Sequence, residues 1–165
     1  MKKSSLILDQ LNIDKKITRI AWEIYEDNTQ HDSIYLIGIC GRGEILASKL
    51  GEEISKISSI KVNLVVLNIN KDNPIEVNLS FDLKSLSNQV VVLVDDVLNT
   101  GKTLMYSCQF LLTINLLKLN TVVLVERLHN SYPIKANYVG LSLATTLQNY
   151  VTVILEGNRK GVYLS

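Results

Sequence analysis

The pattern of apolar and polar positions divides the chain into strands and helices that alternate. In residues 14–27, Ile17, Ile20, Ala21 and Ile24 follow i, i+3, i+4 and i+7 spacing, which predicts a helix with one buried face. Similar patterns predict helices over 44–55 and 102–117, and strands over 34–39, 61–69, from 90 onward and over 121–125, with shorter strands after them. Strands that alternate with helices form βαβ units. The predicted fold class is therefore α/β, with a mostly parallel central sheet flanked by helices.

Length and composition are those of a single domain over residues 1–165. A chain of this size buries about two-thirds of its unfolded surface, and 47% of its residues are apolar. No repeat or low-complexity linker interrupts the pattern. The formal net charge is +1, so no overall field attracts nucleic acid.

Neither the cysteines nor the apolar runs predict a metal site or a membrane partner. Cys40 and Cys108 stand alone, without a CxxC or other metal-ligand spacing. No apolar run approaches the roughly eighteen residues that a membrane span requires. The first Met-Lys-Lys is not followed by a long apolar segment. We therefore expect a cytoplasmic protein.

The stretch VVVLVDDVLNTGKT, residues 90–103, carries the strongest chemical signal. An apolar strand leads into Asp95 and Asp96, and open α/β sheets bind ligands at the carboxyl ends of such strands. A turn and a helix start follow, where backbone N–H groups bind anions. The residues of this turn and helix start are Asn99, Thr100, Gly101, Lys102 and Thr103. The pattern predicts a phosphate in the turn and the hydroxyls of an attached ribose against the carboxylates.

Two other interpretations of this stretch are weaker. An acidic pair and a Thr-Gly-Lys-Thr turn also occur as a helix cap and an ordinary turn, but their combination with an apolar strand in one unbroken run is uncommon. The end of the stretch also looks like a Walker A motif. That motif needs a glycine about five residues before its Gly-Lys pair, where this chain has Asp96.

A second strand, IYLIGI at 34–39, ends in a glycine-containing turn. Cys40, Gly41, Arg42 and Gly43 precede the predicted helix at 44–55. Glycines allow a backbone to approach a ligand closely, and an arginine fork suits bidentate phosphate recognition. Alone, such a turn is more often a simple connection. Upstream of residues 90–103 in the same sheet, it becomes a second candidate phosphate site.

The two turns resemble those of the type I phosphoribosyltransferases, and the likeness covers nearly the whole chain. The resemblance implies that Asp95 and Asp96 hold the ribose 2′- and 3′-hydroxyls of 5-phosphoribosyl pyrophosphate (PRPP). It also implies that residues 99–103 hold the 5′-phosphate and that residues 40–43 hold the pyrophosphate.

The C-terminal segment 122–164 narrows the resemblance to the PyrR branch of pyrimidine-operon attenuators and uracil phosphoribosyltransferases. VLVERLHNSYPIKANYVGLSLATT and the closing hairpin VTVILEGNRKGVYL carry this likeness. It implies that the base lies near Tyr138 and Val139, and it favours uracil. Hypoxanthine-guanine enzymes share the KANYVG-like element, so the base stays open, and Tyr138 as sheet core is the other interpretation.

The chain departs from the family in the polar stretch 70–88. In the family, a stretch at this place carries acidic and arginine residues and forms a hood loop over the carboxyl edge of the sheet. Here no arginine occurs between Arg42 and Arg127. This departure predicts weakened pyrophosphate binding and leaves open a slow enzyme or a binding-only relative.

The resemblance implies Mg²⁺-dependent transfer of the 5-phosphoribosyl group from PRPP to a nucleobase, with release of pyrophosphate. Asp95, Asp96 and Arg42 are the implied catalytic residues, and the two aspartates serve the metal indirectly, through ribose hydroxyls or water. A homo-oligomer, dimer or tetramer, is also implied. The alternative is a PRPP-sensing RNA-binding regulator of pyrimidine genes. The charge pattern does not favour RNA, because acidic residues are interspersed among the basic ones.

Overall fold

The computed structural model describes residues 4–70, 72–144 and 149–165, and the statements below concern these residues. Lys71 in the predicted hood region and residues 145–148 in the C-terminal segment lie outside them. A six-stranded sheet has the order β4-β3-β2-β5-β6-β7. Its strands are β2 (Ser33–Ile39), β3 (Lys61–Ile69), β4 (Val77–Leu79), β5 (Val90–Leu98), β6 (Lys118–Arg127) and β7 (Tyr138–Leu143). All neighbours pair in parallel except β4, which is antiparallel to β3, so the predicted α/β fold is confirmed.

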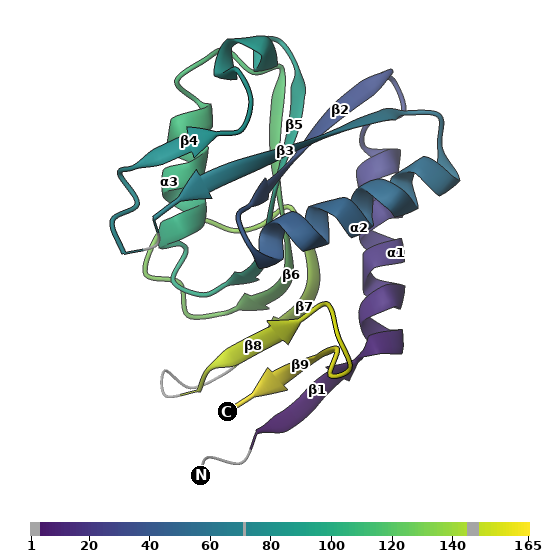
Figure 1. Cartoon of the computed structure of the whole chain (residues 1–165), viewed down its shortest axis with the longest axis vertical. Helices are drawn as coiled ribbons and strands as arrows, with labels where there is room; N and C mark the ends of the chain where they lie inside the picture. Colours follow the sequence, from purple (N-terminus) through teal and green to yellow (C-terminus); the bar gives the residue numbers. More distant parts are fainter. Residues whose placement is uncertain (1–3, 71, 145–148) are drawn as a thin grey trace.

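Helices cover both faces of this sheet (Figure 1). α1 (Gln10–Glu26) and α2 (Arg42–Ile57) pack on one face, and α3 (Lys102–Leu111) packs on the other. Alternate residues of β5 supply the two cores, since Val92 and Val94 face α1 and α2 whereas Val91 and Leu93 face α3. A strand buried on both faces needs a continuous apolar sequence, which explains the run at its start. No helix in the described ranges combines the length and apolarity of a membrane span.

A second, smaller sheet joins the two ends of the chain. β1 (Ser5–Asp9), β9 (Gly161–Leu164) and β8 (Val151–Ile154) pair antiparallel in the order β1-β9-β8. The predicted closing hairpin is confirmed as β8 and β9, whereas β1 was not predicted. Figure 1 shows this sheet next to the carboxyl ends of β5 and β6. We call it the covering sheet.

Helix boundaries differ from the prediction where local hydrogen bonds decide them. α1 begins four residues early because Asp9 caps it, accepting from Asn12 N at 2.8 Å. α3 ends at Leu111 instead of residue 117, because Thr113 N closes a turn on Phe110 O. The freed residues lead back to β6, whose first residue pairs with the first residue of β5. The spacing of the apolar residues did not indicate that the helix ends this early.

The polar stretch 70–88 contains two short elements. β4 pairs with the end of β3, with Ile69 opposite Val77, and a 3₁₀ turn, η1 (Leu83–Leu86), follows it. Because β4 runs back along β3, only the connection before β4 lies at the carboxyl edge of the sheet. β4 extends the sheet on that side. Its action as a hood remains a prediction.

Candidate active site

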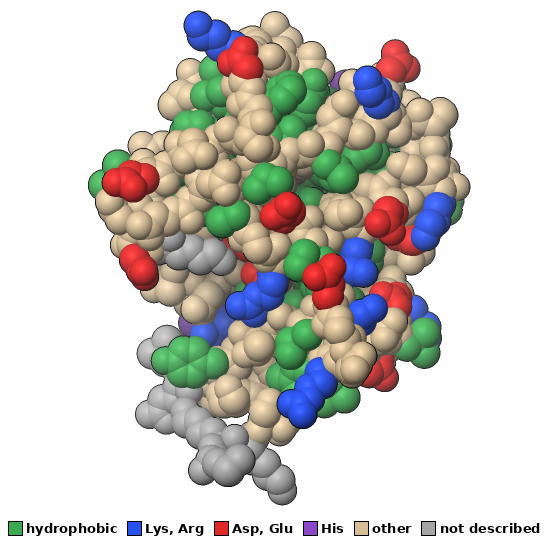
Figure 2. Space-filling view, viewed as in Figure 1, with side chains coloured by type: hydrophobic (Ala, Val, Ile, Leu, Met, Phe, Trp, Pro, Cys, Tyr) green, Lys and Arg blue, Asp and Glu red, His purple; other side chains and the backbone are tan. Residues whose placement is uncertain are grey.

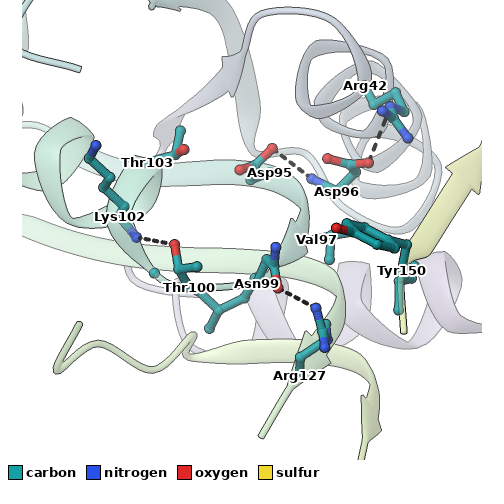
Figure 3. A pocket seen from close by; sticks show the side chains of 13 residues that line it. Arg42, Asp95, Asp96, Val97, Asn99, Thr100, Lys102, Thr103, Arg127 and Tyr150 are labelled. Carbon is teal, nitrogen blue, oxygen red and sulfur yellow. Dashed lines mark hydrogen bonds and ion pairs between the residues drawn. The ribbon is translucent and has the colours of Figure 1, made fainter. Parts of the chain in front are cut away.

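A cavity of about 240 Å³ opens at the carboxyl ends of β5 and β6, beneath the covering sheet (Figure 3). Several elements that are distant in sequence contribute to it. Its lining residues are Arg42, Asp95, Asp96, Val97, Leu98, Asn99, Thr100, Gly101, Lys102, Thr103, Arg127, Tyr150 and Val151. The acidic pair, the turn after it and the arginine of the first glycine turn therefore meet in one place.

Asp95 and Asp96 lie on β5 itself, which continues to Leu98 rather than ending before them. The pairing of β5 with β2 stops at Val94, so the two aspartates extend past β2, whereas β6 continues beside β5 to Leu98. Each is only 5% exposed. Asp96 N donates to Asp95 Oδ1 at 2.9 Å, which holds one carboxylate against the backbone. Two carboxylates are thus buried at the base of a cavity that remains open to ligands.

The turn after β5 presents hydrogen-bond donors. Gly101 has φ +86° and is the N-cap residue of α3, so the cap residue itself has no side chain to accept from the helix N–H groups. Lys102 N donates to Thr100 Oγ1 at 3.2 Å. The first N–H groups of a helix lack intrahelical acceptors, and the helix dipole adds positive potential at this end. A phosphate group accepts from these N–H groups, and its negative charge is favoured by the positive potential.

A second helix N-terminus approaches the same strand. Gly43, in the first turn of α2, packs so closely on β5 that a Cβ at this position would lie 2.7 Å from Val94 O and 3.2 Å from Asp95 Cα. The N-terminus of α2 also lacks a side-chain cap. The close approach brings Arg42 to the cavity, where its Nε lies 3.4 Å from Asp96 Oδ2. Arg42 Nη1 also donates to Val153 O of β8 at 3.2 Å.

Arg127 and Tyr150 line the cavity although the sequence did not single them out as site residues. Arg127 is the last residue of β6, is 6% exposed, and donates from Nη1 to Asn99 Oδ1 at 2.5 Å. The parallel register of β5 and β6 carries it to the same edge as the aspartates, so a polar residue at a strand end was the available signal. Tyr150 immediately precedes β8, and only the position of the covering sheet brings it to the cavity.

Other predicted site residues lie outside this cavity. Tyr138 and Val139 pair with Val122 and Val123 inside the central sheet, below the carboxyl edge. The Tyr138 hydroxyl donates to Asp27 Oδ2 at 2.7 Å, in a separate depression that faces α1. Cys40, Gly41 and Gly43 do not line the cavity either, although Gly41 and Gly43 set the start of α2.

Two pKa values follow from burial. The pKa of Tyr138 is raised above its ordinary value, first by burial and then by the neighbouring Asp27 carboxylate. Burial raises the pKa of the Cys108 thiol, in α3, to about 11. Both groups therefore stay protonated at neutral pH, and both belong to the scaffold rather than to the cavity.

Comparison with known proteins gives a family consistent with this geometry. The phosphoribosyl transferase domain matches residues 4–155. The chain belongs to the type I phosphoribosyltransferase family, in its PyrR branch. The bifunctional protein PyrR of Fusobacterium nucleatum is 32% identical over 163 residues, covering 93% of this chain and 92% of that protein. Its counterpart from Staphylococcus aureus is 35% identical over 161 residues, covering 92% and 91%.

Solved structures of phosphoribosyltransferases have the same fold. The hypoxanthine phosphoribosyltransferase of Trypanosoma cruzi superposes with a TM-score of 0.81 at 18% identity, over 97% of this chain and 95% of that chain. A hypoxanthine-guanine phosphoribosyltransferase from Bacillus anthracis gives 0.72 at 18% identity, over 84% and 81%. At this identity the likeness concerns the fold alone.

The acidic pair of this phosphoribosyltransferase fits Mg²⁺ only together with a ligand. No group of three or more His, Cys, Asp or Glu side chains in the described part of the chain is arranged to hold a metal. Mg²⁺ commonly binds through one or two carboxylates, waters and substrate phosphates. Two carboxylates beside an open cavity suit such a set once a phosphate-bearing ligand is present.

Proposed function

We propose that the protein transfers the 5-phosphoribosyl group from PRPP to a nucleobase and releases pyrophosphate. One observation carries the proposal: two uncapped helix N-termini flank two buried carboxylates beside a single cavity. Helix N-termini attract phosphate groups, and carboxylates accept hydrogen bonds from hydroxyls. PRPP has this order of groups, with a phosphate at one end, ribose hydroxyls in the middle and a diphosphate at the other end.

The 5′-phosphate then lies in the turn at Thr100, Gly101, Lys102 and Thr103, and the ribose lies against Asp95 and Asp96. The diphosphate lies near the start of α2. Arg42 has five N–H donors, so it can bind a diphosphate oxygen while keeping its contacts with Asp96 and Val153 O. Mg²⁺ held together with PRPP beside Asp95 and Asp96 would neutralise the charge that develops on the leaving group.

Catalysis by this arrangement is positioning and electrostatic stabilisation. Breaking the bond at ribose C1 leaves positive charge on the ring and negative charge on the departing diphosphate. The buried Asp95 and Asp96 stabilise the cationic ring, and Arg42 stabilises the diphosphate, since fixed charges in a site with little water act strongly. No covalent nucleophile is required.

Asp96 is also our candidate acceptor of the proton that the base loses. Asp96→Asn keeps the size of the side chain and removes its basicity. We expect kcat to fall by about a hundredfold or more, as is usual when a general base is lost. PRPP binding, measured by calorimetry, should weaken less than this, because Asp95 and the two turns still contact the ligand. Undiminished transfer with intact PRPP binding would rule this role out.

For the base, we propose uracil, held between Tyr150 and the backbone at Val151. Tyr150 is 66% exposed and lines the cavity on the side opposite the phosphate turn, which suits stacking on a planar ring. This replaces Tyr138 and Val139, whose position inside the sheet does not reach the cavity. Membership of the PyrR branch supports uracil over the purine bases.

The deciding experiment is pyrophosphate release from PRPP and Mg²⁺ with uracil, hypoxanthine, guanine, adenine, xanthine or orotate supplied separately. PRPP binding by calorimetry accompanies it, with and without Mg²⁺. We expect release with uracil. PRPP binding without release under any base would favour a sensor, and the absence of both would overturn the proposal.

The RNA-binding regulator remains the alternative prediction. Figure 2 shows Lys and Arg side chains next to Asp and Glu side chains on the visible face, without a basic stripe. Phosphate contacts release counterions, so RNA binding that weakens steeply with salt would favour the regulator. We also propose a homo-oligomer, by likeness to the family, which light scattering at several protein concentrations would test.

A further inference from the structure

Asn99 and Arg127 form a contact inside the cavity that the proposed catalytic steps do not use. Asn99 follows β5, whereas Arg127 ends β6, and Arg127 Nη1 donates to Asn99 Oδ1 at 2.5 Å. A guanidinium carries five donors and no acceptor, so only the oxygen of the amide can face it. The amide NH₂ of Asn99 therefore points away from Arg127. Figure 3 shows this nitrogen directed toward Val97 and Asp96.

We propose that Asn99 is a specificity-determining residue that donates from its amide NH₂ to an acceptor oxygen of the base, and that Arg127 is the positioning residue that sets this orientation. The inference rests on the proposed function and adds to it a requirement on the base. The base must present a carbonyl oxygen, not an N–H group, to this side of the cavity.

The direction of the amide favours the base over the phosphate. The phosphate turn and the start of α3 lie on one side of Asn99, and Tyr150 lies on the other (Figure 3). The NH₂ group is directed away from Lys102 and Thr103. It therefore reaches the region between the carboxylates and Tyr150, where the proposed ring lies.

The chemistry of a pyrimidine dione agrees with a donor at this place. As its ring nitrogen bonds to ribose C1, the base gives up a proton, and the negative charge spreads onto the carbonyl oxygens. An N–H donor stabilises that charge. The guanidinium of Arg127, 6% exposed and one hydrogen bond away, adds positive potential. An amide cannot accept the proton itself, so Asn99 acts by hydrogen bonding alone.

Both partners are attached to one rigid piece of structure. Ser131 N and Tyr132 N donate to Thr100 O at 2.9 and 3.0 Å, so the segment after Arg127 binds the turn that carries Asn99. A Cβ on Gly101 would lie 2.7 Å from Ile134 Cγ2, which shows how closely the two segments pack. The amide orientation is therefore set before a ligand arrives, which reduces the entropy lost on binding.

Asn99→Asp provides the sharpest test. The carboxylate keeps an oxygen for Arg127 and has nearly the same shape, but it turns the group facing the cavity from donor to acceptor. Asn99→Leu removes the donor without adding charge. Asn115→Asp is the matched control, because Asn115 is exposed and its backbone pairs with Asn88, just before the start of β5 and away from the cavity.

The probes are uridine 5′-monophosphate and ribose 5-phosphate, which differ at C1, where the first carries uracil and the second a hydroxyl. Calorimetry gives the dissociation constant of each ligand, and the ratio of the two constants reports the contribution of the base to binding. We expect Asn99→Leu to weaken binding of the nucleotide by about tenfold, as for the loss of one hydrogen bond. Binding of ribose 5-phosphate should stay unchanged. Asn99→Asp should weaken nucleotide binding further, and KM for uracil should rise in parallel. Asn115→Asp should leave both constants unchanged.

Arg127→Met tests the positioning role. Without the guanidinium, the amide is free to turn over, so KM for uracil should rise with little change in kcat. The effect of Asn99→Leu should then shrink in the Arg127→Met background, because coupled residues are non-additive. Thermal unfolding verifies that Arg127→Met is folded, and the two Asn99 variants decide the inference if it is not.

Three results would overturn the inference. One is an unchanged ratio of the two dissociation constants in both Asn99 variants. Another is an equal loss of both ligands in Asn99→Leu, which would assign Asn99 to the phosphate or ribose. The third is a wild-type protein that binds the nucleotide no better than ribose 5-phosphate. Failure of the proposed function is distinguishable, since it appears as a wild-type protein that neither binds PRPP nor releases pyrophosphate.

Discussion

At the scale of single residues, Arg42 connects the parts of the site. It begins α2, its Nε lies 3.4 Å from Asp96 Oδ2 on β5, and its Nη1 donates to Val153 O on β8. One guanidinium thus contacts the carboxylate pair and the covering sheet. Because Arg42 is half-exposed, the stabilisation from its ion pair with Asp96 is small. Its importance lies in placing a positive charge beside the cavity.

The two cysteines should react very differently. Cys40 is half-buried in the turn before α2, whereas Cys108 is buried in α3 with its pKa raised to about 11 by burial. At pH 8 about one in a thousand Cys108 thiols is ionised, and the thiolate is the reactive form. We expect iodoacetamide to label Cys40 alone in the folded protein, as read by peptide mass spectrometry.

PRPP should slow the labelling of Cys40, because the proposed diphosphate lies at the start of α2. Cys40→Ser is the control, in which labelling should require denaturant. Rapid labelling of Cys108 in the folded protein would contradict its burial. A rate at Cys40 that saturating PRPP leaves unchanged would argue against a diphosphate at this turn.

At the scale of elements, the site depends on how closely α2 approaches β5. The helix start is held against the strand at Gly43, which brings one N-terminus beside Asp95 and Asp96. α3 supplies the other N-terminus after the turn at Gly101, whose φ of +86° favours glycine. Two helices on opposite faces of the sheet thus direct their positive ends to one cavity.

Gly43→Ala should disrupt this approach. A Cβ would lie 2.7 Å from Val94 O, and both partners are backbone, so α2 must move away from β5. We expect a loss of about 1–3 kcal/mol in the free energy of unfolding, typical of overpacking, and weaker PRPP binding because Arg42 moves with the helix. Urea unfolding and calorimetry measure the two effects.

Gly51→Ala is the control on the same helix. The nearest neighbours of its Cβ would be side-chain ends, not backbone: Val62 Cγ1 at 3.3 Å, Leu64 Cδ2 at 3.4 Å and Leu36 Cδ1 at 3.7 Å. Alanine is a better helix former than glycine by about 1 kcal/mol, so stability should stay equal or rise. If Gly43→Ala were as stable as Gly51→Ala and bound PRPP normally, the close packing of α2 on β5 would not be needed.

At the scale of the whole molecule, α1 is tied to the far side of the sheet. Tyr138 on β7 donates to Asp27 at the end of α1, and Arg19 Nη2 donates to Val139 O at 2.7 Å and to Gly140 O at 3.0 Å. α1 in turn follows β1, which pairs with β9 in the covering sheet. β1 and β9 are thereby connected to the central sheet through α1.

Tyr138→Phe should reduce stability without affecting ligand binding. It removes the hydrogen bond to Asp27, so the free energy of unfolding should fall by about 1–2 kcal/mol. Because its folded pKa is raised above the unfolded value of about 10, the stabilising effect of Tyr138 is complete below pH 10 and is lost as the pH rises above it. The difference between wild type and variant should therefore shrink above pH 10.

Urea unfolding at pH 7 to 11 measures this difference. Tyr163→Phe is the control. The Tyr163 hydroxyl donates to Arg159 O at the surface, so its loss should change stability little. PRPP binding by Tyr138→Phe should equal that of the wild type. A marked loss of PRPP or nucleotide binding would show that Tyr138 takes part in ligand binding.

The sequence by itself determined the α/β class, the strands β2, β3, β5 and β6 of the central sheet, and the two glycine-containing turns that follow β2 and β5. Each depends on local information. Strands buried on both faces need continuous apolar runs, and turns at strand ends need glycines and polar side chains in a fixed order. For the same reason Asp95, Asp96, Arg42 and the residues after β5 could be selected without coordinates.

Only the tertiary structure decided which further residues reach the cavity. Arg127 arrives through the register of β6, and Tyr150 arrives because β8 pairs with β9, whose other neighbour is β1 at the opposite end of the chain. Tyr138 is of a residue type that often contacts ligands, yet its place in β7 directs its hydroxyl toward Asp27. Pairing between segments far apart in sequence leaves no periodic pattern within either one. The residues around the proposed base could therefore be identified only after the chain had been folded.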